Sequence, residues 1–331
     1  MVNISDVARA AGVSKATVSY VLSNDPRITE QTAAKVRKAV EDLGYTVNHA
    51  ARALSVKKTM TLGIISPAYH GSYLSALFGL HMYLLSEQAA KFGYDTLSIC
   101  SDSGDQALNK AWASRKVDGF ILMDVSDDDP RLSMAASLGA PTVAFGSPLD
   151  SYGLDSVDSD FPKAAQHTIE YLAQEGHTEI ILLLWSRSIF RRKMGFALRF
   201  RDTILEQAKI HGITAHIVFP EDDESDPSVT IAASLRDYPN ATAMVLHNES
   251  ATIVAPQTFA DLGVHVPDDL RVVTLFPKQL FTSMRIPFVS IDIDVAALVE
   301  TAIMLLLSRI SNPNAPMVRQ AFDFPMSLKY Q

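Results

Sequence analysis

Residues 3–22, NISDVARAAGVSKATVSYVL, carry the start and stop signals of two short helices. Asn3 is a favourable N-cap for a helix over 4–11, and Gly12 can adopt the left-handed conformation that turns the chain sharply after it. A second helix, over 15–23, then begins. The apolar residues of both helices recur at helical spacing on one face: Ile4, Val7, Ala8, Ala11, Val18, Val21 and Leu22. The stretch therefore predicts two helices that pack together across a tight turn.

A third helix is predicted over 29–43 and stops at Gly44. Its apolar face consists of Ala33, Val36, Val40 and Leu43. The second helix follows its N-cap, Ser14, and has a short, mostly polar outer face made of Lys15, Ala16, Ser19 and Tyr20. A three-helix unit whose second helix presents such a face is typical of a domain that reads bases in the DNA major groove.

The distribution of charge agrees with nucleic-acid binding by this head alone. The whole chain has a formal net charge of −8, yet residues 1–60 hold nine Lys and Arg against five Asp and Glu. Charges are screened within about 8 Å in cellular salt, so a basic head can attract phosphate in spite of an acidic body. Chance asymmetry would give the same excess, and the charge by itself does not establish DNA binding.

Residues 48–56, NHAARALSV, form an alanine-rich segment without Gly or Pro. These nine residues are fewer than the roughly 12–15 that an isolated helix needs to be stable in water. The segment is therefore expected to become helical only against a partner. The alternative is a plain linker.

Three motifs of the head together resemble the lactose-repressor (LacI/GalR) family of bacterial transcription regulators. They are DVAxxAGVSxxTVSxVL over 6–22, the Leu43-Gly44-Tyr45 end of the third helix, and Ala51-Arg52-Ala53-Leu54. The resemblance implies that the second helix enters the major groove, with base-reading positions at Lys15, Ala16 and Tyr20. It implies phosphate contacts by Ser14, Thr17, Ser19 and Asn24. It also implies that Leu54 inserts into the minor groove at the centre of a palindrome.

Beyond residue 60, short apolar runs alternate with helical segments. Nine runs are strand-like: 62–66, 96–100, 119–123, 142–145, 180–185, 216–219, 243–247, 272–276 and 289–293. Helical candidates between them include 73–92, 161–175, 191–211 and 295–310. This alternation predicts an α/β body with parallel sheets covered by helices, and a ligand site beyond the carboxyl ends of the strands.

Further motifs extend the resemblance into the body. They are Asp118-Gly119-Phe120-Ile121, Gly176-His177, Arg192-x-x-Gly195-Phe196 and Pro267-Asp268-Asp269-Leu270. They imply two lobes like those of periplasmic binding proteins, with a cleft between them. The expected domains are a helix-turn-helix head (1–46), a hinge helix and linker (47–60), and an effector-binding and dimerisation body (61–331). One lobe is expected at about 61–160 and 290–318, the other at about 161–289 and 319–331.

The resemblance implies five effector contacts: Tyr73, Asp160, Arg192, Asn248 and Phe276. Arg192 matches the family arginine that makes bidentate hydrogen bonds to ligand hydroxyls or to a carboxylate, for which a guanidinium is well suited. Structural roles are the alternatives. Arg192 would then be a surface cation, Asn248 a helix cap and Tyr73 a core aromatic.

The chain departs from the family pattern at three places around the expected cleft. Phe276 stands where the family has an acid that binds sugar hydroxyls, and Asn248-Glu249 replaces an Asn-Asp pair. An acidic run over 221–224 follows Phe219, where relatives often place an aromatic residue. The lost carboxylate disfavours a simple neutral hexose, because a buried hydroxyl would lack an acceptor. The expected effector is a modified sugar, a glycoside or another metabolite with an apolar part and an anionic or carbonyl end.

Signatures of other protein classes are missing from the sequence. It contains no phosphate-binding glycine loop, no nucleophile elbow and no His-Glu-x-x-His, so neither a catalytic site nor a cofactor is expected. The single cysteine, Cys100, can form neither an intramolecular disulfide nor a cysteine metal site. The absence of an apolar signal core and of a long apolar run predicts a cytoplasmic protein without a membrane span.

These features together predict a transcription regulator, a repressor, that binds a palindromic operator as a homodimer under the control of a small-molecule effector such as a sugar derivative. Two alternatives stay open: a DNA-binding regulator with a vestigial cleft and no effector, and an enzyme fused to a DNA-binding head. The sequence does not identify the effector, the operator, or whether the effector releases or strengthens DNA binding.

Overall fold

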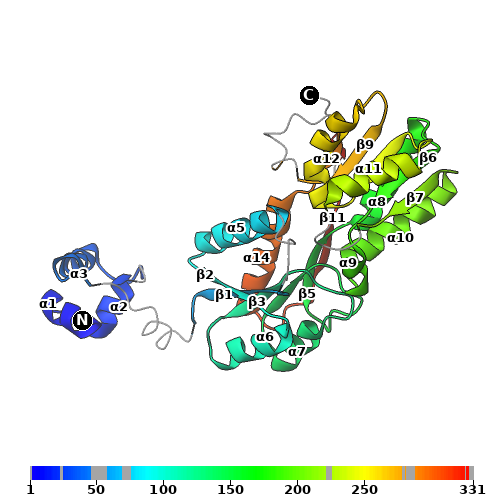
Figure 1. Cartoon of the computed structure of the whole chain (residues 1–331). Coiled ribbons are helices and arrows are strands. Elements are labelled where there is room, and N and C mark those ends of the chain that lie inside the picture. The colour runs from blue at the N-terminus through cyan, green and yellow to red at the C-terminus, as the bar shows by residue number, and fades with distance from the viewer. Residues whose placement is uncertain are drawn as a thin grey trace. The chain divides into compact units, whose positions relative to one another are not determined.

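A computed structural model describes residues 2–22, 25–45, 58–68, 76–220, 226–277, 280, 288–324 and 326–327. The chain divides into two compact units, Met1–Thr59 and Met60–Gln331 (Figure 1). Within the described ranges, no helix combines the length and the apolar character that a bilayer span requires.

The head consists of α1 (Ile4–Ala11), α2 (Lys15–Leu22) and α3 (Glu30–Asp42), close to the predicted helices. Asn3 caps α1 in a reciprocal box with Asp6, and Gly12 ends that helix in the left-handed conformation, with φ at 66°. The fully buried core of the head is small: Val7, Ala8, Val18, Val21, Ala33, Val36 and Ala39.

The prediction that Leu43 belongs to this core is wrong. Helix α3 ends at Asp42, so Leu43 no longer continues its apolar face and lies exposed at the C-cap. Gly44 follows in the left-handed conformation and folds the chain back. The N–H of Tyr45 then donates to the carbonyl of Val40 (2.9 Å), and Tyr45 packs against the core.

Six parallel strands form the first sheet of the body, in the order β11-β5-β4-β3-β1-β2. Their bounds are Thr61–Ser66 (β1), Asp95–Cys100 (β2), Gly119–Leu122 (β3), Thr142–Phe145 (β4), Asp155–Ser159 (β5) and Arg319–Phe322 (β11). One face is covered by α5 (Ala76–Lys91) and α14 (Val295–Ser311). The other face is covered by α6 (Gly104–Ala113) and α7 (Pro130–Leu138), so that the sheet lies between two helical layers (Figure 1).

The second sheet has the order β12-β10-β9-β8-β6-β7, and β12 alone runs antiparallel to its neighbour. Its strands are Glu179–Leu183 (β6), Thr214–Val218 (β7), Ala243–Leu246 (β8), Arg271–Leu275 (β9), Val289–Ile291 (β10) and Met326–Ser327 (β12). Helices α8 (Phe161–Gln174) and α10 (Gly195–Ile210) cover one face, while α11 (Pro227–Asp237) and α12 (Glu249–Leu262) cover the other. The predicted two-lobe body with parallel sheets is therefore confirmed.

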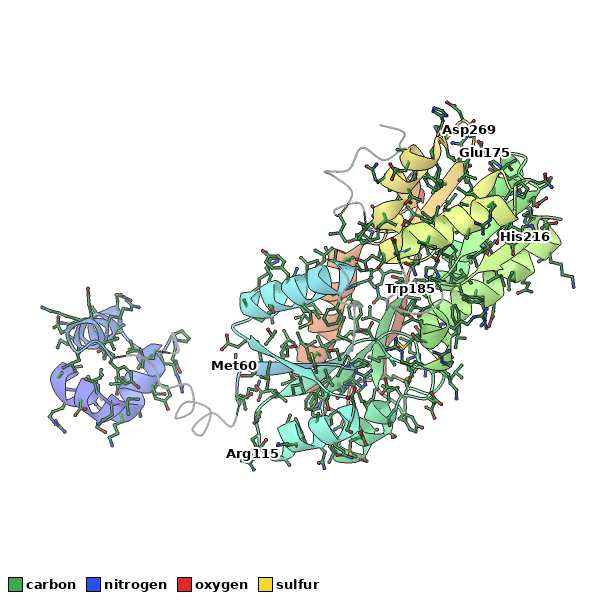
Figure 2. All side chains as sticks on the ribbon, viewed as in Figure 1. Met60, Arg115, Glu175, Trp185, His216 and Asp269 are labelled. Carbon is green, nitrogen blue, oxygen red and sulfur yellow. The ribbon has the colours of Figure 1, made fainter. Side chains whose placement is uncertain are left out.

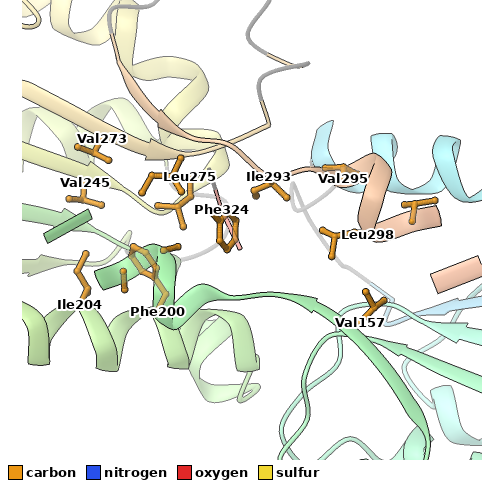
Figure 3. Packing of buried hydrophobic residues seen from close by; sticks show 14 of the residues in the cluster. Val157, Phe200, Ile204, Val245, Val273, Leu275, Ile293, Val295, Leu298 and Phe324 are labelled. Carbon is orange, nitrogen blue, oxygen red and sulfur yellow. The ribbon is translucent and has the colours of Figure 1, made fainter. Parts of the chain in front are cut away.

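The chain passes between the two lobes at slightly different points from those expected. Strand β10 pairs with β9, so the first lobe resumes only after Ile291. Strand β11 pairs with β5 in the first sheet, although 319–331 is expected in the second lobe. This short edge strand, RQAF, is mostly exposed and lacks the apolar alternation that would reveal its partner. Phe324, beyond β11, packs in a core that extends from one lobe to the other (Figure 3).

Two further differences have local causes. Strand β5, DSVDS, is not predicted because four of its five residues are polar, yet all five are buried. Arg309 compensates the charge of Asp155 within this strand through contacts of 2.8 and 3.0 Å. The helix expected over 191–211 begins only at Gly195, as α10, and a separate short helix, α9 (Arg187–Arg191), precedes it; Lys193 between the two adopts a left-handed conformation with φ at 53°.

Candidate functional site

Helix α2 exposes a contiguous face on the head. Lys15, Ala16 and Tyr20 lie on it, while Val18 and Val21 on the opposite side are buried. The Tyr20 side chain is 43% exposed, and the guanidinium carbon of Arg27 lies 5.1 Å from its ring centroid. This cation–π contact favours one orientation of the ring, so that α2 presents a preformed surface.

The start of α2 carries the hydroxyl groups that are expected to contact phosphates. Ser14 caps the helix by accepting the N–H of Thr17 (3.0 Å), and the two hydroxyl oxygens lie 2.9 Å apart. Hydroxyls at a helix N-terminus, together with its N–H groups, suit binding of an anion. Ser19 is half-buried beside this face. Asn24 and Leu54 lie outside the described residues.

A cavity of about 140 Å³ lies in the body, where the carboxyl ends of strands from both sheets converge. The first lobe contributes residues that follow β3 and β4 and the last residues of β5, and the second lobe contributes residues that follow β6, β8 and β9. Trp185, two residues after the end of β6, lies between the lobes (Figure 2). A cavity of this size accepts a ring as large as benzene. Its position is the one expected for a ligand site in parallel sheets.

Direct contacts connect the two lobes around this cavity. The N–H of Leu77 donates to Oε1 of Glu249 across the lobes (3.0 Å). The N–H of Asp127 donates to the carbonyl of Lys193 (3.0 Å), and the Asp127 carboxylate accepts from Arg199 (2.9 Å). A ligand in the cavity would therefore contact both lobes at once.

Comparison with known proteins identifies this arrangement. Residues 3–48 match the sequence profile of bacterial regulatory proteins of the lacI family, and residues 169–329 match that of a periplasmic binding protein-like domain. The chain belongs to the LacI family. This is the family whose motifs the head and body resemble.

Relatives of this LacI-family chain align along most of its length. The HTH-type transcriptional regulator MalR of Staphylococcus xylosus is 26% identical over 314 residues, which cover 88% of this chain and 87% of that protein. The HTH-type transcriptional repressor PurR of Photobacterium profundum is 27% identical over 328 residues, covering 95% and 93%. The chain is thus a DNA-binding transcription regulator, and its relatives are regulators rather than enzymes.

Solved structures confirm the fold. The lac repressor dimer bound to operator and the anti-inducer ONPF superposes with a TM-score of 0.79 at 20% identity, covering 98% of this chain and 97% of that one. A complex of the transcriptional regulator CelR with cellobiose superposes with a TM-score of 0.68, also at 20% identity, over 99% and 98% of the two chains. Both support a helix-turn-helix head joined to a two-lobe body.

The structure brings two of the five expected effector contacts to the cavity. Asn248 and Phe276 line it. Asn248 is also the N-cap of α12, accepting the N–H of Ala251 (2.9 Å), so both roles considered for it coexist. Asp160 caps α8 and is not among the lining residues. Tyr73 lies outside the described part of the chain.

Arg192, expected at the cleft, is not among the residues that line the cavity. Arg192 is exposed at the C-cap of α9 and donates to Ser188 Oγ (3.2 Å). The break at Lys193 ends α9, and the new helix α10 carries Arg199 to the cavity instead. The guanidinium that lines the cavity is therefore that of Arg199.

Asp158 and Arg199 are neighbouring charged residues of the cavity wall. The two Asp158 oxygens accept the N–H groups of Ser147 and Ser159, each at 2.8 Å. Burial raises the pKa of Asp158 to about 6, although the N–H of Ser159 and the charge of Arg199 oppose this shift. Arg199 lies 4.0 Å from Asp158 and 2.9 Å from Asp127. Its charge is therefore already shared by two carboxylates.

His247 lies at the centre of an aromatic cluster in the second lobe. Its ring centroid is 4.1 Å from that of Phe200, and it also contacts Phe161, Trp185 and Phe196. The side chain is 4% exposed, and its Nδ1 has no hydrogen-bond partner among the described residues. Burial lowers the pKa of His247 to about 3, so the imidazole is neutral at physiological pH.

A strained residue contributes to the cavity from the first lobe. Asp124, just after β3, has a positive φ of 50°, which is unusual for a residue other than glycine. The buried Arg131 donates to the carbonyls of Met123 (2.8 Å) and Asp124 (3.1 Å) and thereby holds this turn. Strain of this kind persists where the surroundings impose it, often at ligand sites.

Sequence reasoning missed Asp124, Asp158, Trp185, Arg199 and His247 as lining residues. Three of them had a usable signal, because Asp124, Trp185 and His247 fall at or just after the ends of predicted strands. Asp158 belongs to a strand that the sequence pattern does not predict. The sequence carries no signal that Arg199 lines the cavity, because its location depends on the break between α9 and α10.

His247 should make the body sensitive to acid. The unfolded chain binds a proton at His247 below pH 6.5, whereas the folded chain does so only near pH 3. The free energy of unfolding should therefore fall as the pH drops through this window, by about 2 kcal/mol from this residue between pH 6.5 and 5. In His247→Phe this contribution to the pH dependence of the free energy of unfolding should vanish. Urea unfolding at several pH values measures it.

The exposed His211 supplies the matched control. His211→Asn removes an exposed imidazole and leaves the aromatic cluster around His247 intact, so the contribution of His247 to the pH dependence should persist. If His247→Phe retained the full slope below pH 6.5, the buried neutral imidazole would not be its origin.

Proposed function

We propose that the chain controls transcription as a homodimer on a palindromic operator, and that a small molecule in the body cavity changes its affinity for that operator. The observation that carries the proposal is the cavity lined by residues of both lobes, in a chain whose head exposes one face of α2. A ligand that binds one relative orientation of the lobes better than another shifts the population between them.

The proposed DNA contacts follow from the family resemblance and from the exposed face of α2. Lys15, Ala16 and Tyr20 would read bases in the major groove. Phosphate contacts would come from Ser14, Thr17, Ser19 and Asn24. Leu54 would wedge into the minor groove at the centre of the site. Because one head reads only a short half-site, two heads related by a two-fold axis are needed for specific binding.

The proposed effector contacts begin with Asn248 and Phe276, and Tyr73 remains a candidate. Two structural neighbours with small molecules support a ligand of this kind in such a body: CelR in complex with cellobiose, and the lac repressor bound to operator and the anti-inducer ONPF. PurR relatives are named as repressors, which favours repression as the output.

Selection of bound sequences from random DNA, with the purified full chain, tests the proposal. The selected sites should share a two-fold symmetric sequence, and the logarithm of the affinity should fall linearly with the logarithm of the salt concentration, because lysines and arginines displace counterions. Compounds that raise the melting temperature of the protein should then change its affinity for the selected site.

Two outcomes would contradict parts of this proposal. Selected sites without two-fold symmetry would rule out a dimer on a palindrome. Compounds that bind the cavity and leave operator affinity unchanged would instead favour a regulator without effector control.

A further inference from the structure

The described wall of the cavity holds more carboxylates than cationic side chains. Three carboxylates line it, Asp124, Asp158 and Glu249. Arg199 is the only Lys or Arg among the described residues that line it, and Asp127 already engages its guanidinium at 2.9 Å. The described wall therefore offers acceptors and negative charge, with little positive charge left for an anionic ligand.

The three carboxylates approach the cavity from different directions. Asp124 follows β3, Asp158 lies in β5, and Glu249 begins α12 in the other lobe. Glu249 is 5% exposed and Asp158 is 9% exposed. Burial of several carboxylates in one place is costly unless a positive charge or hydrogen-bond donors compensate it. A bound cation would add positive charge to the N–H donors that Asp158 and Glu249 already have from Ser147, Ser159 and Leu77.

Aromatic rings form the remaining part of the wall. Ring centroids lie 5.7 Å apart in both the Phe161–Phe196 and the Trp185–Phe196 pair, and His247 contacts all three residues. Clusters of ring faces attract organic cations and also stack on flat ligands. The buried Nδ1 of the neutral His247, which has no partner within the described chain, adds a ring nitrogen for a hydrogen bond.

We propose that the effector of this cavity is an organic cation, a compact ring compound that carries a protonated amine and no phosphate or carboxylate. The inference rests on the proposed function, since it assumes that the cavity is the effector site. The amine would lie among Asp124, Asp158 and Glu249, and the ring would lie against the aromatic wall. The anionic or carbonyl end expected from the sequence depended on Arg192, which does not line the cavity.

Three probes of matched shape test the charge preference: benzylamine, benzyl alcohol and benzoate. Each carries one six-membered ring, which the cavity can hold, and they differ in the charge of the polar end. Titration of the full chain at neutral pH, followed by calorimetry or ligand-observed NMR, should show benzylamine binding about tenfold more tightly than benzyl alcohol. Benzoate should bind most weakly of the three, because it meets the carboxylates.

Two isosteric variants locate the origin of the preference. Glu249→Gln keeps an oxygen for the N–H of Leu77, and Asp124→Asn suits the left-handed backbone at that position. Each should weaken benzylamine binding several-fold and leave benzyl alcohol binding unchanged. Asp261→Asn removes an exposed charge elsewhere on α12 and should change neither.

The outcomes separate this inference from the proposed function. Failure of benzylamine to bind more tightly than benzyl alcohol, including failure of all three probes to bind, overturns the inference. An unchanged preference in both Glu249→Gln and Asp124→Asn overturns it as well. If an uncharged or anionic compound binds the cavity and changes operator affinity, the inference fails while the proposed function stands. If benzylamine binds as expected but no cavity ligand changes operator affinity, the inferred preference for a cation stands and the proposed control by an effector fails.

Discussion

Replacing Lys15 and Tyr20 together by alanine is expected to change which base pairs the regulator prefers and to abolish most of its specific binding. Both side chains are exposed on α2, and neither belongs to the head core, so the three-helix fold should persist. A good contact to a base edge contributes about 1–3 kcal/mol of discrimination, and the double variant loses two such contacts in each head. Selection from random DNA with wild type and variant, followed by fluorescence anisotropy on both consensus sites, measures the change.

Lys38 provides the matched control for this experiment. It is an exposed cation on α3 rather than on α2. Lys38→Ala should leave the base preference intact, and any loss of affinity should be similar for all sequences, as for a charge that acts only on phosphate. An unchanged consensus in the Lys15 and Tyr20 double variant would show that α2 does not read the bases.

Arg131→Met is expected to give the largest loss of stability in the body. Arg131 is 4% exposed, pairs with the equally buried Asp129, and donates to the carbonyls of Ile65 (3.0 Å), Met123 and Asp124. The variant leaves a buried carboxylate without its cation and several carbonyls without a donor. The expected cost is about 3–5 kcal/mol in the free energy of unfolding, measured by urea denaturation.

Two further variants make this prediction specific. Asp129→Asn in the Arg131→Met background should recover part of the loss, because it removes the uncompensated charge and keeps an N-cap oxygen for α7. Arg236→Met removes an exposed arginine whose partner is the adjacent Asp237 and should change stability by no more than about 0.5 kcal/mol. Equal effects of Arg131→Met and Arg236→Met would contradict a structural role for the buried pair.

The local elements of this protein could be predicted from the sequence because their signals lie within a few residues of one another. Asn3, Gly12 and Ser14 act on their own helix ends, and all nine apolar runs of the body became strands of two parallel sheets. The predictions failed where the signal was weak or conflicting. Strand β5 is polar, and Leu43 follows a helix that ends one residue earlier than expected.

The sequence by itself determined the three-helix head, the exposed face of α2, the two-lobe architecture and the family. Those properties depend on helix caps, on hydrophobic periodicity and on long sequence motifs. All of these can be recognised without knowing which distant residues are in contact. Only the tertiary structure decided which charges line the cavity. A left-handed residue at Lys193 leaves Arg192 exposed and lets α10 carry Arg199 inward, and the polar strand β5 places Asp158 beside it. Both outcomes depend on contacts between residues far apart in the chain, because burial and pairing set the energy of a charge and sequence spacing does not.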